Sequence, residues 1–312
     1  MIFLTKARNL ITGIIMEKQK QALVYAMTAV IFWSTVATAF KITLGYTDAM
    51  PLVLYASLTS TIFLFIYLLF NRKIYLIKTV TQSDLVRSAL LGLLNPFLYY
   101  IVLFQAYDRL PAQQAQPLNY LWPIMLVLLS IPLLKQKINP TSIIAILTSF
   151  CGAFIISTQG QLSNIKPSDP IGVTLALGSS IIWALYWIYN LKQKQDPVLT
   201  LFLNFCFGSA YMLITFLLFF KFQPLSAPAV VGCIYVGLFE MGLTFIVWLY
   251  ALKFSSKTAY IANLIYLAPF ISLFFIHFIL GESVHPSTLI GLFLIVTGII
   301  IQKRLSLKSK PQ

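Results

Sequence analysis

The sequence predicts an all-α integral membrane protein with ten transmembrane helices, arranged as two inverted repeats of five. Three observations indicate this fold. Of the 312 residues, 59% are hydrophobic and 10% are charged, whereas a typical soluble domain is about 25% charged. The apolar residues gather in ten stretches, each near the length of about 20 residues that crosses a bilayer. A segment of the first half also recurs in the second half.

The ten predicted spans follow one another through short connections, so neighbouring helices are expected to be antiparallel. They cover residues 22–41, 50–70, 85–107, 112–134, 141–158, 171–190, 197–220, 228–252, 258–280 and 287–302. Because these spans occupy most of the chain, we expect no soluble domain.

The repeat is marked by residue types that seldom match by chance in an apolar chain. Residues 120–123 (Tyr-Leu-Trp-Pro) recur 146 positions later as residues 266–269 (Tyr-Leu-Ala-Pro). Two further pairs match at this offset: Pro140 with Pro286, and Gly152 with Gly298. Internal repeats in a hydrophobic chain are typical of duplicated membrane transporters.

Each repeat holds five spans, so the second repeat must enter the membrane from the opposite side to the first. This makes the repeat an inverted one. The predicted boundaries are a tail at 1–21, the first repeat at 22–158, an outer linker at 159–170, the second repeat at 171–302 and a basic tail at 303–312.

The net charge of +14 follows this topology and does not predict nucleic-acid binding. With the N-terminus inside, 18 of the 22 Lys and Arg residues fall in inner segments, and the outer four are Lys41, Arg109, Lys166 and Lys221. Lys and Arg near short loops are retained in the cytoplasm. We therefore expect a bacterial inner-membrane protein with both termini cytoplasmic and no nucleic-acid partner, as a monomer or a weak dimer.

The first 15 residues are weakly hydrophobic, too short to span a bilayer, and lack the small-residue cleavage site of a signal peptide. Met16 opens a basic run that leads directly into the first span. We expect either that translation begins at Met16 or that residues 1–15 form a dispensable tail.

Four prolines are expected to kink predicted spans: Pro96, Pro117, Pro123 and Pro269. Proline removes a helix hydrogen bond and displaces the carbonyl four residues before it, which frees the carbonyl groups of Asn119 and Ile265. In lipid such a group needs a partner in protein or a wet cavity. Many kinks serve packing alone, but matched kinks in two repeats commonly frame a central site.

Four features carry a family resemblance: residues 33–35 (Trp-Ser-Thr), residues 182–184 (Ile-Trp-Ala), the Pro123 and Pro269 pair, and residues 280–282 (Leu-Gly-Glu). With the order of the spans, they make residues 17–305 resemble the drug/metabolite transporter superfamily, as an EamA-type ten-helix permease. Residues 32–35 and 119–123 resemble its aromatic amino acid exporter group. The resemblance implies a basket of helices around a central cavity, with spans 5 and 10 packed at the back.

Glu240 falls near the centre of a predicted span, whereas the other seven acids fall at loops or span ends. An ionised carboxylate there costs on the order of 3 kcal/mol or more, so its presence indicates a specific role. It could bind a cationic amine of a substrate, carry a proton, or bridge helices as a structural residue. His277, in the last turn of span 9 near the inner surface, is either a packing residue or the partner of Glu240 in a proton relay.

Aromatic, amide and hydroxyl side chains cluster in the spans expected to face the cavity. Amides suit the backbone groups of an amino acid, and aromatic faces suit a planar group or a cation. Gln116 and Asn119 share a helix face, as do Trp183 and Trp187. Interfacial anchoring of aromatics and helix-to-helix bonding by hydroxyls remain open alternatives. The candidate substrate-binding residues are Trp33, Ser34, Thr38, Asn95, Tyr99, Asn119, Tyr120, Trp122, Trp183, Tyr186, Trp187, Glu240, Asn263 and Tyr266.

Motifs of several other classes are missing. The sequence has no Gly-Lys dipeptide, so it lacks a P-loop for ATP, and it has no His-Glu-x-x-His zinc helix. Cys151, Cys206 and Cys233 show no metal spacing and predict no disulfide framework. We therefore expect no cofactor, no metal and no catalytic residue.

Together these features predict a secondary active transporter, and not an enzyme, that moves a small polar metabolite by alternating access. The resemblance favours export of an aromatic or neutral amino acid, with H⁺ as a candidate coupling ion. The alternative is uptake or exchange of a nucleoside-like or cationic metabolite such as S-adenosylmethionine. More distant alternatives are a polytopic membrane enzyme, which would need clustered acids, and a channel.

Overall fold

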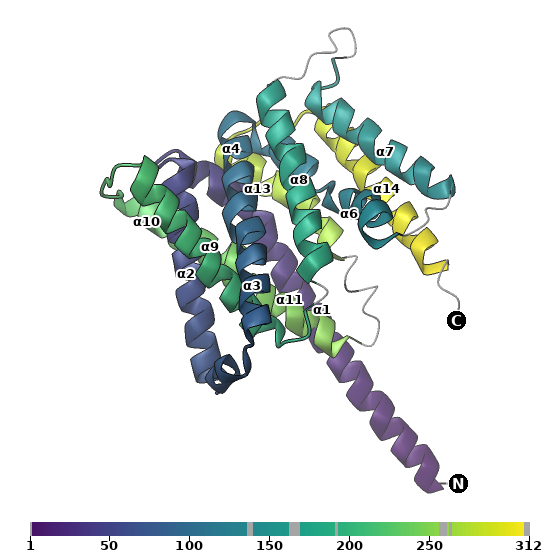
Figure 1. The fold of residues 1–312 in the computed structure, drawn as a ribbon. Helices are drawn as coiled ribbons and strands as arrows, with labels where there is room; N and C mark the ends of the chain where they lie inside the picture. Colours follow the sequence, from purple (N-terminus) through teal and green to yellow (C-terminus); the bar gives the residue numbers. More distant parts are fainter. Residues whose placement is uncertain are drawn as a thin grey trace.

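The computed structural model describes the backbone of residues 2–135, 140–161, 169–190, 193–255, 261 and 264–308. Side chains are described from residue 17 onward within these ranges, except for residues 140–142 and 302–308. In this part of the chain every regular element is a helix (Figure 1).

The helices of the two halves follow the predicted order. The first half contains α1 (Ile2–Leu44), α2 (Ala49–Phe70), η1 (Ile74–Thr79), α3 (Gln82–Gly92), η2 (Leu93–Leu98), α4 (Tyr99–Arg109), α5 (Ala112–Asn119), α6 (Trp122–Leu134) and α7 (Pro140–Ser157). The second half contains α8 (Pro170–Asn190), α9 (Pro197–Phe219), α10 (Ala227–Val236), η3 (Gly237–Gly242), α11 (Leu243–Phe254), η4 (Leu264–Leu267), α13 (Ala268–Leu280) and α14 (Pro286–Lys308).

Within the described residues, seven helical stretches are long and apolar enough to cross a bilayer. Three shorter apolar helices accompany them, at Ile143–Ser157, Leu264–Leu280 and Pro286–Ile301. These ten segments correspond to the ten predicted spans, and the predicted all-α membrane fold is confirmed. The first helix differs in extent, because α1 begins at Ile2 and so continues through the segment predicted as a tail.

Four spans are interrupted near their middle. Spans 3 and 8 each contain a π-helical turn, η2 and η3, and within η2 Asn95 leaves the helical region with φ −145° and ψ 121°. Span 4 breaks between α5 and α6, and in span 9 η4 leads into α13. Pro123 and Pro269 lie in the first turn of α6 and α13, where a missing N–H costs no helix bond. Pro117 lies inside α5, which continues past it to Asn119.

Helices α7 and α14 lie side by side along one edge of the molecule (Figure 1). Their backbones touch through glycines. A Cβ atom added to Gly152 would lie 2.4 Å from the carbonyl oxygen of Gly291, and one added to Gly298 would lie 2.5 Å from that of Ala145. Small residues allow such close approach between membrane helices.

The close approaches between α7 and α14 repeat under the 146-residue offset. Ser149 Oγ donates a hydrogen bond to the Ile295 carbonyl at 3.2 Å. Gly298 approaches Ala145, and the residues equivalent to these two, Gly152 and Gly291, approach each other in the same way. Ser149 and Ile295, which share the hydrogen bond, are themselves 146 positions apart. Residues that are equivalent in the sequence repeat therefore make equivalent contacts in this helix pair.

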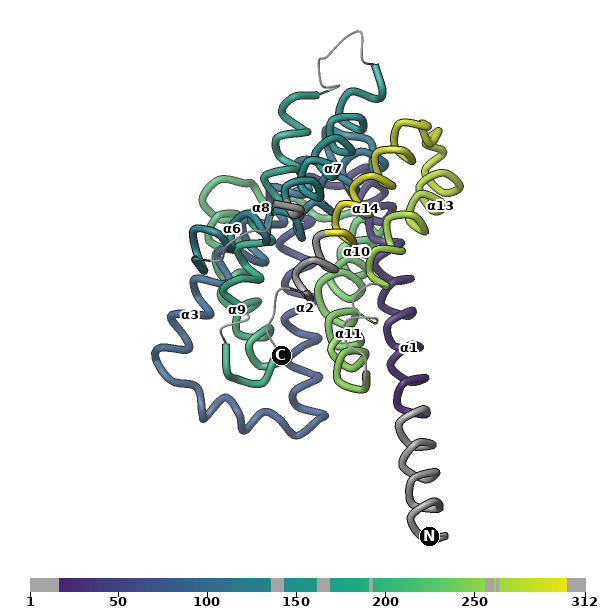
Figure 2. The backbone as a smooth tube through the Cα atoms, turned by 90° about the vertical axis from the view of Figure 1, so that its right-hand side faces the viewer, coloured from purple at the N-terminus to yellow at the C-terminus, as the bar shows by residue number. Residues whose placement is uncertain are grey.

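The remaining long helices surround the interior. Helix α1 contacts both α11 and α13, and α2 packs on α9. Figure 2 shows α11 running beside α1. This arrangement places faces of α1, α4, α8 and α11 around a common space.

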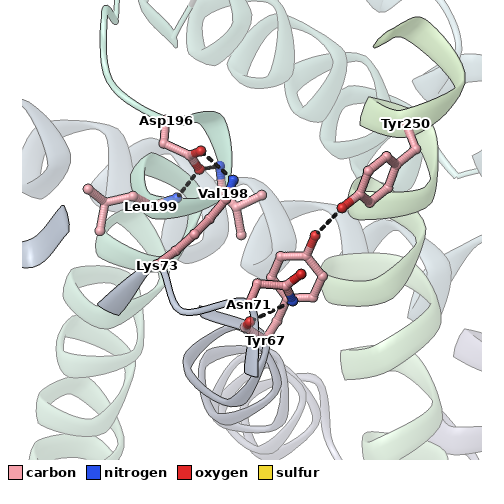
Figure 3. Close-up of polar contacts among 7 residues, drawn as sticks. All are labelled: Tyr67, Asn71, Lys73, Asp196, Val198, Leu199 and Tyr250. Atoms are coloured by element: carbon pink, nitrogen blue, oxygen red, sulfur yellow. Dashed lines mark hydrogen bonds and ion pairs between the residues drawn. The ribbon is translucent and has the colours of Figure 1, made fainter. Parts of the chain in front are cut away.

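Two polar contacts tie α2 and the connection that follows it to the second half, at the predicted cytoplasmic end (Figure 3). Lys73 Nζ lies 2.6 Å from a carboxylate oxygen of Asp196, whose other oxygen accepts the N–H groups of Val198 and Leu199 at the start of α9. The hydroxyl groups of Tyr67 and Tyr250 are 2.7 Å apart. Partial burial acts to raise the pKa of Asp196, but the bonds from Lys73 and the two N–H groups outweigh it and hold the pKa below its ordinary value.

Replacing Lys73 with Gln is expected to lower the free energy of unfolding by about 0.5–1 kcal/mol at pH 7, since partly exposed ion pairs contribute little. Because the pKa of Asp196 is depressed in the folded protein, this contribution is present above the ordinary carboxyl value of about 4. It is lost as the pH falls through the folded-state value. Thermal denaturation of both proteins from pH 7 to pH 3 measures it. Lys78→Gln, at an exposed residue of the same connection, is the control, and a difference unchanged by pH would contradict the assignment.

Candidate functional site

A cavity of about 350 Å³ lies between the helices of both halves. Its volume is within the range of roughly 300–1,000 Å³ typical of small-molecule sites. The lining residues are Trp33, Val36, Ala37, Phe40, Tyr99, Leu103, Tyr107, Gln116, Asn119, Tyr120, Trp122, Leu126, Trp183, Trp187, Glu240, Phe245, Trp248, Leu252, Ile265 and Tyr266. All five tryptophans of the chain are among them.

Glu240 is the one acidic residue among the described residues of this lining, and it lies on the π-helical turn η3. The turn packs tightly on α2, because a Cβ atom on Gly237 would lie 2.4 Å from the Ala56 carbonyl oxygen. Thr244 Oγ1 donates to the carbonyl of Phe239 across the turn. The tight packing on α2 leaves the Glu240 side chain on the cavity side, where the hydroxyl of Tyr100 donates to Oε1 at 3.2 Å.

Asn119 lies at the C-terminal end of α5, where span 4 breaks, and its side chain is held from two sides. The Tyr99 hydroxyl donates to Oδ1 at 3.3 Å, and Nδ2 donates to Ser179 Oγ at 2.8 Å. Both bonds bring α5 against α4 and α8, and they orient the amide at the cavity wall.

The tryptophans form a connected aromatic wall. Trp33 contacts Trp248 and Phe245, with ring centroids 5.6 and 5.8 Å apart. Phe245 also contacts Trp183 at 6.0 Å. Trp187 then links Trp183 to Trp122, at 6.0 and 6.5 Å. The stacked rings of Tyr99 and Trp183, 4.6 Å apart, join this wall to α4.

Polar contacts hold together the predicted outer end of the molecule. Glu282, beyond α13, accepts the N–H groups of Ala112 and Gln113 at 3.0 and 3.3 Å. The Gln113 amide donates to the Ser283 carbonyl and accepts bonds from His285 N and Thr288 Oγ1. We call these contacts the outer seal.

A second set of contacts reinforces this end. Lys41 Nζ donates to the carbonyl groups of Tyr107 and Leu110 at 2.8 and 3.3 Å. Tyr107 and Phe40, which line that part of the cavity, are 3% and 2% exposed. In contrast, Trp187, Trp248 and Leu252 toward the predicted cytoplasmic end are half-buried.

The structure brings together nine of the fourteen candidate substrate-binding residues in the cavity lining. These are Trp33, Tyr99, Asn119, Tyr120, Trp122, Trp183, Trp187, Glu240 and Tyr266. Asn263 lies outside the described residues.

Four candidates are not among the lining residues: Ser34, Thr38, Asn95 and Tyr186. Ser34 is fully buried and donates to the Val30 carbonyl within α1. Thr38 is 3% exposed, and Asn95 is fully buried. Tyr186 accepts a bond from Asn204 Nδ2 of α9 at 3.3 Å. Of these four side chains, Tyr186 makes a helix-to-helix bond, and Ser34 bonds within its own helix.

The structure does not bring His277 to the cavity, and His277 lies at the end that the predicted topology places outside. Its ring is exposed, and Nδ1 lies 3.0 Å from the Glu282 carbonyl, at the end of the molecule formed by the outer seal. Span 9 runs toward this end because span 8 ends at the cytoplasmic side. His277 is therefore separate from the cavity and does not meet Glu240.

Five cavity residues with polar or aromatic side chains are missing from the candidate set: Phe40, Tyr107, Gln116, Phe245 and Trp248. Gln116 shares a helix face with Asn119, and this proximity to a candidate was a reason to add Gln116 to the candidate set. Trp248 lies eight residues after Glu240 in the same span, a spacing of about two helical turns that would have found it. Within the described part of the chain, no group of three His, Cys, Asp or Glu side chains could hold a metal ion.

One family model matches both halves of the chain. The model of the EamA-like transporter family matches residues 20–158 and again residues 170–302. A crystal structure with 19% sequence identity superposes with a TM-score of 0.63, over 94% of this chain and 99% of that one. This likeness supports the fold alone.

Three relatives of this chain are named as transporters or exporters. The uncharacterized transporter YvbV of Bacillus subtilis is 29% identical over 71% of this chain and 72% of its own length. An uncharacterized transporter of Clostridium kluyveri is 26% identical over 90% of this chain and 93% of its own length. The aromatic amino acid exporter YddG of Ancylobacter novellus is 24% identical over 81% of this chain and 87% of its own length.

Proposed function

Because this chain belongs to the EamA-like transporter family, in the drug/metabolite transporter superfamily, we propose that it moves a small amine-bearing metabolite across the bacterial inner membrane by alternating access. Both termini lie in the cytoplasm in this proposal, and the protein works as a monomer or a weak dimer. The cavity is the binding site, and Glu240 is the residue that receives the amine.

The observation that carries the proposal is the position of Glu240 in the lining. A carboxylate in a membrane interior is costly unless it has a partner. Its described hydrogen bond is the long one from Tyr100, 3.2 Å to Oε1. A substrate ammonium group would supply the missing charge, and the aromatic wall would cover the rest of the molecule.

Two substrate classes fit this site. Aromatic or neutral amino acids are supported by the likeness to the exporter of Ancylobacter novellus, and that likeness favours export. A cationic metabolite, as S-adenosylmethionine would be, is supported by the single negative charge of the lining. H⁺ is a candidate coupling ion, which Glu240 would carry when no amine is bound.

A proteoliposome flux assay tests the proposal. We expect the purified protein to exchange radiolabelled amine-bearing metabolites across the bilayer, and an opposing pH gradient to change the net flux at least about twofold if H⁺ is coupled. Protein-free liposomes give the background rate. Flux of no amine-bearing compound above that rate, with folded protein in the bilayer, would reject the proposed function. Equal flux with and without the gradient would reject proton coupling alone.

A further inference from the structure

The geometry points to an organic monocation with a planar aromatic body as the preferred substrate, bound more tightly than the amino acid built on the same ring. This inference rests on the proposed function, because it concerns the same cavity. It follows from the charge of the lining, the composition of its wall and the hydrogen bonds already made by its polar groups.

The charge of the lining is one-sided. Of the 20 lining residues in the described part of the chain, Glu240 is acidic and none is Lys, Arg or His. A monocation would neutralise this charge. A zwitterion would bring a second carboxylate into the same low-dielectric space, where an uncompensated charge is costly.

A described basic residue beside the lining, Lys41, is already engaged. Lys41 lies on α1 one residue beyond Phe40, a lining residue, and its Nζ donates to the carbonyl groups of Tyr107 and Leu110 at the end of α4. A basic side chain is favoured at a helix C-terminus. Recruiting Lys41 for a substrate carboxylate would leave those two carbonyl groups without their donor.

At the break in span 4, most of the described N–H groups already have partners. Helix N-termini bind anions through N–H groups that lack a partner. Around the start of α6, the N–H groups of Tyr120, Leu121, Ile124 and Met125 all donate to carbonyl groups of residues 116–121, at 2.9–3.3 Å. Pro123 has no N–H group. The amide of Asn119 is also used, because Nδ2 donates to Ser179.

The wall suits a cation with a flat body. Lys and Arg groups and ligand cations bind over aromatic faces, most strongly over tryptophan. All five tryptophans of the chain line the cavity, as do Tyr99, Tyr120 and Tyr266. Gln116 Oε1 is buried and makes no hydrogen bond with the described residues, so it adds a neutral acceptor for an N–H group.

A matched set of three ligands separates the two classes. Tryptamine, tryptophan and indole-3-propionate share one ring and carry an amine, both groups, or a carboxylate. Isothermal titration of the purified protein in nanodiscs at pH 7 is expected to show tryptamine binding at least about tenfold more tightly than tryptophan. Indole-3-propionate is expected not to bind. The Glu240→Gln variant should reduce the preference for tryptamine to less than about threefold.

The Asp108→Asn variant is the matched control, because it removes one negative charge from an exposed residue outside the lining. It should keep the wild-type ranking. Tryptophan binding as tightly as tryptamine, or more tightly, would overturn this inference and leave the proposed function intact. Failure of all three ligands to bind would also overturn it, and the flux assay would then decide the proposed function separately. The ranking in the wild-type protein needs no variant to fold.

Discussion

Replacing Glu240 with Gln is expected to reduce substrate counterflow by roughly 30-fold or more, with the fold intact. Loss of one partner of a buried charge pair costs about 2–5 kcal/mol, and each 1.4 kcal/mol corresponds to about a tenfold change. Gln has nearly the same size and keeps an oxygen that can accept the Tyr100 hydroxyl bond. The charge is therefore removed with little change in packing. Counterflow in proteoliposomes measures the effect, and thermal denaturation verifies the fold.

The Asp108→Asn variant again serves as the control and should transport at the wild-type rate, since Asp108 is exposed and does not line the cavity. Normal counterflow by the Glu240→Gln variant would assign Glu240 a structural role as a hydrogen-bonding link between η3 and α4. A variant that lost both transport and thermal stability would point to the same structural role.

Replacing Gly298 with Ala is expected to destabilise the protein by about 1–3 kcal/mol through overpacking. The added Cβ would lie 2.5 Å from the Ala145 carbonyl oxygen and 3.1 Å from the backbone nitrogen of Ser149. Backbone atoms cannot move aside as a flexible side chain does, so α7 and α14 would have to separate. Thermal denaturation in detergent micelles measures the loss as a lower melting temperature.

The comparison is with Gly178→Ala on α8, where the nearest atom to an added Cβ is Val102 Cγ1 at 4.0 Å. Alanine favours a helix over glycine by about 1 kcal/mol, so this variant should be neutral or slightly stabilised. Equal melting temperatures for the two variants would show that the α7–α14 contact relaxes without cost.

Much of the fold could be predicted from the sequence, because short segments of the chain determine each span. Runs of apolar residues define the spans, and the matched residues Pro123 and Pro269 mark the helix starts that follow the breaks in spans 4 and 9. The turn η3 was not predicted, because span 8 contains no proline near Glu240. Gly237 and Gly242, at its two ends, are the available signal, but glycine is common in membrane helices.

The site was harder to predict, because the rotation of each helix about its axis decides which residues face the cavity. A single sequence does not give this rotation. A π-helical turn contains an extra residue and changes the face presented by the residues after it. This explains why Tyr99, just after η2, lines the cavity while Asn95 inside η2 is buried elsewhere. In α8, Trp183 lines the cavity, whereas Tyr186, three residues later, bonds to α9.

The outer seal has a consequence for how strongly the carrier holds its cargo from each side. Opening the outer end would break the bonds of Gln113 and Glu282, each contributing about 0.5–1.5 kcal/mol or somewhat more where a carboxylate accepts. A ligand arriving from outside binds only the fraction of molecules that are open there. Its apparent dissociation constant is the intrinsic constant divided by that fraction and is therefore larger. In the proposed orientation, a ligand arriving from the cytoplasm enters past the half-buried Trp187 and Trp248 and does not break these bonds. The same cavity would therefore display two affinities, the weaker one facing outward.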